Sequence, residues 1–453
     1  MNSVKRLFAG IAGAFMLLTA AAPMTAGAVN SLAGAETELT DGTFTYEIVN
    51  GSYTITKCEA TAIVSEIPEM RNGYAITAIA DGAFMNCAYI PEITIPDTVK
   101  SIGRSAFAYC TSMKSVHLPD KLGGIADGTF MGCTMLESVD IPDSVSIIDD
   151  YAFFGCQVLS EIKLPASLTS IGDMAFAECM GLTNIDASNS SEFTVSDGIL
   201  YNKDMTDIYR ASTALSGDVV IGNTVERILP GAFSLCESIE HVFLPSSVMS
   251  IGDDAFSYCS SMKKIDMADG LNSIGNIAFK FCYALESADF PTTLKSIGDG
   301  AFYQCKALAR VTIPDGITSV GEGVFVDCPA LNGVLLPESL TDIGANAFGY
   351  KISDDGEYTL QEGFTLDVHS NTPGLSYAKS NGIAYNVVNR SIKSLAFIVV
   401  AAALLISAAV FAIKLMAKGK KSAPAAVKKA DKEQKELEEA ESYQKILDDS
   451  DNA

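Results

Sequence analysis

A phenylalanine recurs every 23 residues along most of this chain, and this period constrains the fold more than any other feature. The series is Phe84, Phe107, Phe130, Phe153 and Phe176, and it resumes after a gap at Phe233, Phe256, Phe279, Phe302, Phe325 and Phe348. A cysteine follows each of these residues by three positions, from Cys87 to Cys328, and only Phe348 lacks one. A unit this short cannot bury its apolar side chains alone, so successive units must stack and share one core. The period therefore predicts a solenoid.

The order of residue types within one unit indicates how each coil is built. Residues 161–164 alternate polar and apolar side chains, which is typical of a half-buried strand. Pro165 ends that strand, because proline cannot donate to a strand ladder. The Ile171-Gly172 pair marks a bend where a residue without a Cβ atom is useful. The fold class that we expect is an α/β-type repeat solenoid with one short parallel strand per coil, caps at both ends and a single C-terminal transmembrane helix.

The repeated units resemble the BspA-like leucine-rich repeat family, whose consensus reads LPxxLxxIGxxAFxxCxxLxxI. The match in one unit comprises Ile95-Pro96, Ile102-Gly103, Ala106-Phe107, Cys110, Met113 and Val116. The resemblance extends over residues 76–348. Because members of this family are associated with attachment to host matrix proteins and with co-aggregation of cells, the resemblance implies a surface protein that binds other molecules.

Segments on either side of the repeats are expected to cap the solenoid, which we place at residues 76–348. In the N-terminal cap, residues 29–75, strands over 44–48 and 53–56 should turn at Asn50-Gly51, a dipeptide that suits a two-residue hairpin turn. In the C-terminal cap, residues 349–390, we expect a strand, a short helix and a second strand over 364–368, 372–380 and 384–388. Phe176 and Phe233 are 57 residues apart, 34 more than the period, so an inserted island at residues 187–223 should carry two or three strands. The island either fills space or contacts a ligand.

Both ends of the chain have the composition of targeting and anchoring segments. Residues 1–28 combine the basic Lys5 and Arg6, an apolar stretch and a small-residue cleavage pattern, which together are typical of a signal peptide. A retained first transmembrane helix is the alternative. Residues 394–417 include an uninterrupted apolar run long enough to cross a bilayer, which takes about 20 helical residues. Basic residues after this run predict a cytoplasmic tail at residues 418–453, and hence a single-pass plasma-membrane protein with an extracellular N-terminal ectodomain.

The cysteine spacing favours a ladder of buried thiols. Ten of the eleven cysteines occupy the same position in successive units, so their side chains should point the same way from stacked coils. Parallel Cβ vectors hold the sulfur atoms too far apart for a disulfide. A zinc site would need paired ligands such as C-x₂-C, and the chain has none. We therefore interpret these residues as small buried hydrophobes.

Composition and motifs limit the classes of function. The formal net charge of −24 argues against nucleic-acid binding, which needs a basic face, and favours cationic or neutral partners. The chain has three histidines and contains no H-E-x-x-H, G-x-S-x-G or phosphate-binding loop motif. We therefore expect no catalytic residues, no metal site and no cofactor.

Outward-facing strand positions form the candidate binding surface, because the strand face is the usual binding surface of leucine-rich repeats. The candidates are His117, Asp140, Lys163, Asp186, His241, Phe243, Asp266, Asp289, Arg310 and Leu335. Phe243 and Leu335 are apolar where most units carry a polar residue, so they could anchor a partner. Single exposed apolar residues are common, however, and need no functional explanation.

The leading functional hypothesis is a cell-surface adhesin or recognition protein. Its partners would be extracellular proteins or glycans, from host matrix or neighbouring cells, bound along the strand face of a membrane-anchored ectodomain. The alternatives are a single-pass receptor that signals through its cytoplasmic tail and a structural spacer of the cell envelope.

Overall fold

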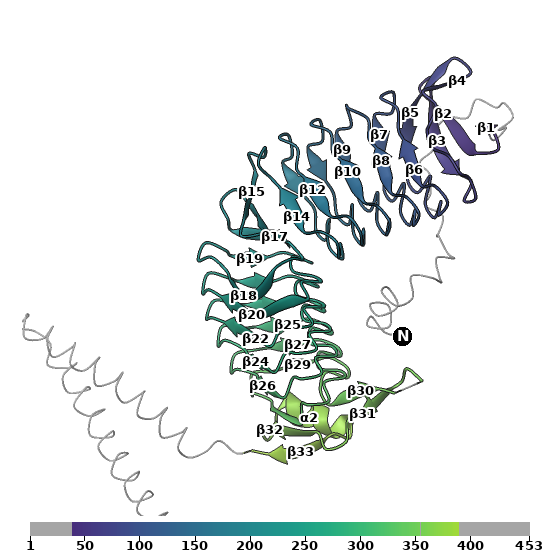
Figure 1. Cartoon of the computed structure of the whole chain (residues 1–453). Coiled ribbons are helices and arrows are strands. Elements are labelled where there is room, and N and C mark those ends of the chain that lie inside the picture. The colour runs from purple at the N-terminus through teal and green to yellow at the C-terminus, as the bar shows by residue number, and fades with distance from the viewer. Residues whose placement is uncertain (1–38, 354, 389–453) are drawn as a thin grey trace, which may run out of the picture. The chain divides into compact units, whose positions relative to one another are not determined.

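The computed structural model describes residues 39–353 and 355–388, in which the repeated units stack as coils of a β-solenoid (Figure 1). Each regular coil contributes two strands, so two ladders run along the stack. The face ladder consists of β6 (Glu92–Thr94), β8 (Ser115–His117), β10 (Ser138–Asp140), β12 (Glu161–Lys163), β14 (Asn184–Asp186), β18 (Ser216–Val220), β20 (Ser238–Leu244), β22 (Lys264–Met267), β24 (Ser287–Asp289), β26 (Arg310–Thr312), β28 (Gly333–Leu335) and β32 (Thr365–Val368). The short ladder consists of β7 (Ser101–Ile102), β9 (Gly124–Ile125), β11 (Ile147–Ile148), β13 (Ser170–Ile171), β19 (Arg227–Ile228), β21 (Ser250–Ile251), β23 (Ser273–Ile274), β25 (Ser296–Ile297), β27 (Ser319–Val320) and β29 (Asp342–Ile343).

The strands of neighbouring coils pair in parallel and in register. In the face ladder Val116 lies beside Val139, and in the short ladder Ile148 lies beside Ile171. Both pairs are one period apart, so each coil places the same residue type at the same height. Because alternate strand residues point to opposite sides, the apolar member of each triplet is buried and its two neighbours face outwards.

The expected α/β class is wrong, because the coils contain turns where an α/β solenoid would have helices. The only helix in the part of the chain that the structure describes is α2 (Pro373–Ser380), which lies in the C-terminal cap. The turn around each repeated phenylalanine contains two residues in the left-handed region, as with Tyr151 (φ 54°) and Gly155 (φ 71°) around Phe153. Left-handed residues spaced this closely interrupt any right-handed helical turn. The expectation of one strand per coil is also wrong, since the Ser-Ile segments before the bend form the second ladder.

The structure also contradicts the predicted single-pass anchoring in the plasma membrane. Within residues 39–353 and 355–388, no helix is long and apolar enough to cross a bilayer. The predicted spanning segment at 394–417 lies outside these residues, as do the predicted signal peptide at 1–28 and the predicted tail at 418–453.

The repeated phenylalanines form a stacked spine through the core. Successive rings lie 4.7–5.7 Å apart between centroids, with interplanar angles of 2–27°. The cysteines form a second row, and all eleven are free and buried. Cys110 Sγ donates to Phe84 O at 3.2 Å, and the equivalent contact recurs at 3.1–3.3 Å from Cys133 to Cys328 in most coils. The predicted thiol ladder is therefore present, and in most coils the thiol donates to a backbone carbonyl of the preceding coil.

Glycine at the bend is required by the close approach of neighbouring coils. A Cβ atom added to Gly252 would lie 2.6 Å from Pro230 N in the preceding coil. Such a contact is far inside van der Waals distance, so a side chain would push the coils apart. The Ile-Gly pair thus sets the tight stacking of the short ladder.

Both ends of the described chain close the solenoid with β-structure. The N-terminal cap consists of β1 (Leu39–Thr40), β2 (Phe44–Val49), β3 (Ser52–Cys58), β4 (Met70–Arg71) and β5 (Tyr74–Ile79). Strands β2 and β3 form an antiparallel hairpin that turns at Asn50 and Gly51, both with positive φ, and β5 pairs in parallel with β3 and β7. The C-terminal cap contains the hairpin of β30 (Tyr350–Ile352) and β31 (Tyr358–Leu360), then β32, α2 and β33 (Ala384–Val387).

The insertion interrupts the spine and divides the core into two clusters. Its strands β15 (Phe193–Ser196), β16 (Ile199–Asn202) and β17 (Asp207–Ala211) are antiparallel, and β17 then pairs in parallel with β19 to continue the short ladder. One buried cluster runs from Phe44 to Leu200 and the other from Ile199 to Ile383. No ring stacking joins Phe176 to Phe233, both within the described chain; Ala211 N instead donates to Ala232 O. We call the meeting point of the two clusters, residues 171–183 and 207–234, the joint.

Candidate binding surface

The structure places all ten predicted surface residues on strands of the face ladder. Most are exposed, whereas Asp186, His241, Phe243 and Asp266 are half-buried. Hydrogen bonds group the ladder into five short sheets: β6–β8–β10, β12–β14, β18–β20–β22, β24–β26 and β28–β32–β33. The insertion separates β14 from β18, so we call the face up to β14 the N-terminal part and the face from β18 onwards the C-terminal part.

The N-terminal part of the face is acidic and hollowed near His117. Two hollows, of about 380 and 290 Å³, share Thr94 and His117 in their lining. Glu66 and Glu69 line the first hollow, and Asp140 lines the second. Among described residues, no group of acidic, histidine and cysteine side chains is arranged to hold a metal ion.

The C-terminal part brings His241, Phe243 and Asp266 together. The His241 and Phe243 rings lie 3.8 Å apart between centroids, and His241 Nε2 lies 3.0 Å from Asp266 Oδ2. Lys264 Nζ lies 2.7 Å from Asp266 Oδ1. Hydrogen bonding from Lys264 holds the pKa of Asp266 below its ordinary value, so this carboxylate stays ionised. The ionised Asp266 carboxylate fixes the position of the His241 ring. The His241 ring in turn packs against the Phe243 ring.

Further along this part, Arg310 Nη2 lies 2.9 Å from Asp289 Oδ2. Both side chains are largely exposed, so the pair contributes little to stability. Leu335, on β28, lies beside Asp367 of β32 in the C-terminal cap, and 49% of it is exposed. The structure therefore leaves Leu335 apart from the His241 cluster.

The sequence analysis missed Val220, which extends the apolar surface at Phe243. Val220 belongs to β18, pairs with Phe243 in the parallel register, and is 74% exposed. Residues 216–220 fall within the predicted island, but in the structure they form β18, the first face strand of the C-terminal part. The alternation of Val219 and Ile221, both buried, was the available signal. The turn before β18 lacks the Phe and Cys of a regular coil, which concealed it.

The joint contains a cluster of buried charged and polar side chains. Arg210 is 1% exposed, and its Nη1 donates to Gly231 O and Ser234 O, both at 2.9 Å. Glu178 and Asp254 face this arginine and Lys280, and burial raises the pKa of both carboxyls, that of Asp254 to about 7. Arg210 Nη2 also donates to Cys179 O at 3.5 Å, so this side chain contacts the backbone on both sides of the joint.

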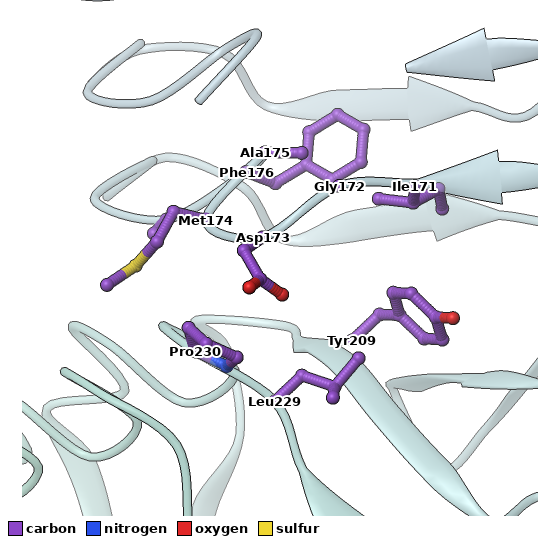
Figure 2. A pocket seen from close by; sticks show the side chains of 10 residues that line it. Ile171, Gly172, Asp173, Met174, Ala175, Phe176, Tyr209, Leu229 and Pro230 are labelled. Carbon is purple, nitrogen blue, oxygen red and sulfur yellow. The ribbon is translucent and has the colours of Figure 1, made fainter. Parts of the chain in front are cut away.

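Figure 2 shows a small hollow at the joint between Met174 and Asp173 on one side and Leu229, Pro230 and Tyr209 on the other. Its volume of about 10 Å³ is close to that needed for a single water molecule. It is therefore too small for an organic ligand.

These features define a leucine-rich-repeat solenoid of the all-β type, with a strand face that carries an apolar pair among charges. A family model for the BspA type leucine-rich repeat region, in six copies, matches residues 77–206 and 226–353. The chain belongs to the BspA type leucine-rich repeat family.

Two solved structures illustrate the similarity. A leucine rich cell surface protein from Faecalibacterium prausnitzii A2-165 is 29% identical, with a TM-score of 0.52, over 69% of this chain and 95% of that chain. The pneumococcal vaccine antigen PcpA is 17% identical, with a TM-score of 0.53, over 78% of this chain and 98% of that chain, and this likeness shows the fold alone. No curated protein matches the chain. The expectations of no catalysis, no metal and no cofactor stay predictions.

Proposed function

We propose that this chain is a surface recognition protein that binds an extracellular protein through the C-terminal part of its strand face. The observation that carries the proposal is the apolar pair of the exposed Val220 and the half-buried Phe243, flanked by the charges of Asp266 and Lys264. An apolar centre with a charged rim is the usual anatomy of a protein-binding surface. The Faecalibacterium prausnitzii relative is described as a cell surface protein, which supports the same location for this chain.

The arrangement suits a partner that inserts an apolar side chain between charged contacts. His241 supports Phe243 from one side, so the ring keeps its position without a partner. A pre-positioned ring loses little conformational entropy on binding, and such aromatic residues contribute much of the affinity of protein interfaces. The charged rim would orient the partner and reject proteins that present an apolar surface alone.

The test is binding of the purified full chain to an array of extracellular matrix proteins and mucins, measured for the wild type and for Val220→Ser/Phe243→Ser. The matched control is Val158→Ser/Met180→Ser, which changes two apolar residues that are 40% and 53% exposed outside the face ladder. Residues at the centre of an interface contribute about 2 kcal/mol or more, so the face variant should bind roughly 30-fold more weakly. The control should bind like the wild type. Equal affinity of the face variant and the wild type would contradict the proposal, as would the absence of any bound protein.

A further inference from the structure

A hollow of about 450 Å³ lies between the last coils and the β30–β31 hairpin of the C-terminal cap. Its volume falls within the range of roughly 300–1,000 Å³ that is usual for small-molecule sites. It is lined by three amides from Gln304, Asn332 and Gln361, two ammonium groups from Lys306 and Lys351, two carboxylates from Asp327 and Glu362, and Pro329. None of these residues belongs to the face ladder strands, so this hollow is separate from the surface proposed above.

The hollow exists because the cap adds a hairpin to the regular turns. Gln304 and Asp327 occupy equivalent positions in neighbouring turns, each with φ of 57°. Lys351 lies on β30, and Gln361 follows β31. Asp327 N donates to Tyr350 O at 3.0 Å, so the hairpin is attached to the last regular turn at this point. The same combination of turn and hairpin occurs once in the described chain.

Two of the amides are held in place before any ligand binds. Gln361 Nε2 donates to Leu331 O at 2.9 Å and to Pro329 O at 3.2 Å, which leaves its Oε1 as an acceptor. Gln304 Nε2 donates to Asp327 Oδ2 at 3.1 Å, and Asp327 Oδ1 accepts from Ile352 N at 2.9 Å. Long polar side chains normally lose about 1.5–2 kcal/mol of conformational entropy when they become ordered. Because these two amides are already ordered in the folded protein, part of this entropy is lost on folding and not on ligand binding.

Neither lysine forms an ion pair with a described residue, although the carboxylates of Asp327 and Glu362 line the same hollow. Both Asp327 oxygens already accept hydrogen bonds, from Gln304 Nε2 and Ile352 N. Within the described residues, no carboxylate lies within 4 Å of Lys306 Nζ or Lys351 Nζ, whereas Lys263 and Lys264 each pair with an acid. Lys306 Nζ instead lies 4.9 Å from the centre of the Tyr283 ring. Tyr283 is 37% exposed but is not among the residues that line the hollow.

We propose that this hollow binds a carboxylated sugar unit, either a uronic acid or a sialic acid. The ammonium groups of Lys306 and Lys351 bind the carboxylate, because charge-assisted hydrogen bonds are the strongest available there. The amides of Asn332 and Gln361 bind hydroxyl groups, which need both donors and acceptors.

The test is calorimetric titration of the purified full chain with glucuronic acid, N-acetylneuraminic acid, glucose and inorganic phosphate. We expect saturable binding of at least one of the two acids, at least tenfold weaker binding of glucose, and weaker binding of phosphate. Lys306→Gln/Lys351→Gln should bind the acid at least tenfold more weakly. The matched control, Lys100→Gln/Lys203→Gln, changes two exposed lysines elsewhere and should bind like the wild type.

Several outcomes would overturn the inference. These are no binding of either acid, unchanged binding by the Lys306 and Lys351 variant, equal binding of glucose, or phosphate binding as tight as that of the acid. Circular dichroism of each variant shows that a loss is not due to unfolding. Val220→Ser/Phe243→Ser should keep full affinity for the sugar, so failure of the strand-face proposal and failure of the sugar site are measured separately.

Discussion

Replacement of Phe153 by alanine should destabilise one half of the solenoid and leave the other half intact. Phe153 is fully buried and lies 5.5 Å from Phe130 and 5.6 Å from Phe176 between ring centroids. Removal of a buried phenylalanine side chain typically costs about 3–5 kcal/mol. In a repeat protein this loss spreads through contacts between neighbouring coils. The loss of stability should therefore end at a boundary where the contacts between neighbouring coils are weak.

The joint is such a place, for two reasons that the structure shows. The spine has no ring stacking between Phe176 and Phe233, and the core is divided there into two clusters. Regular turns are also tied by backbone bonds such as Phe153 N to Ala175 O at 2.8 Å. The equivalent amides of Met174, Phe176 and Glu178 donate to no backbone carbonyl among the described residues.

Hydrogen exchange measured by mass spectrometry on the full chain tests this prediction. A cost of about 3–5 kcal/mol corresponds to exchange faster by roughly 150-fold to several thousand-fold, where exchange requires unfolding of the affected half. In Phe153→Ala this acceleration should be confined to residues 81–187, with wild-type rates at 232–348. The mirror variant is Phe279→Ala, whose ring lies 5.3 Å from Phe256 and 4.9 Å from Phe302, and it should give the opposite pattern. Equal acceleration of both halves by either variant would refute the reasoning.

Three further predictions concern the cysteines and the joint. The thiols from Cys110 to Cys328 should resist alkylation in the native chain, because burial raises their pKa values. All eleven thiols should react in denaturant without reductant, and fewer than about nine reactive thiols would contradict the free-thiol ladder. Burial raises the pKa of Asp254 from 3.8 to about 7, so the protonated carboxyl is favoured in the folded state. The contribution of Asp254 to stability should be largest below about pH 4 and be lost as pH rises through 7. Asp254→Asn should reduce the pH dependence of the free energy of unfolding, measured by urea titration, by up to about 4 kcal/mol, whereas an unchanged pH profile would contradict this. Arg210→Met should lower the free energy of unfolding by about 3–5 kcal/mol in denaturant titration. The substitution removes a buried cation that bonds two carbonyls and faces Glu178 and Asp254. A loss of stability below about 1 kcal/mol would show that the cluster contributes little.

The period of Phe and Cys was sufficient to predict the solenoid, the inward-facing spine and the unpaired thiols. These features depend on contacts between equivalent residues of adjacent coils, and the spacing of residues such as Phe107 and Cys110 encodes those contacts directly. The second ladder was missed because a two-residue strand such as Ser170–Ile171 is too short to show alternation. The absence of helices was also missed, since left-handed residues such as Tyr151 are not recognisable from residue type.

The candidate sites were predicted less well, because they depend on irregular parts of the chain. Phe243 stood out as an exception to the repeat, but Val220 did not, since it follows an insertion that lacks the repeat residues. The hollow near the C-terminal cap joins Lys306 to Lys351 through a hairpin. No local pattern indicates that these residues, 45 positions apart, share one site.

The most direct test of the account is a hydrogen-exchange footprint of the full chain in complex with the protein ligand identified on the array. The account predicts that bound ligand slows exchange mainly at residues 216–220 and 238–267, which carry Val220, Phe243 and Asp266. Protection confined to the turns around Phe153 or to the N-terminal cap would contradict the claim that the strand face beyond the joint is the binding surface.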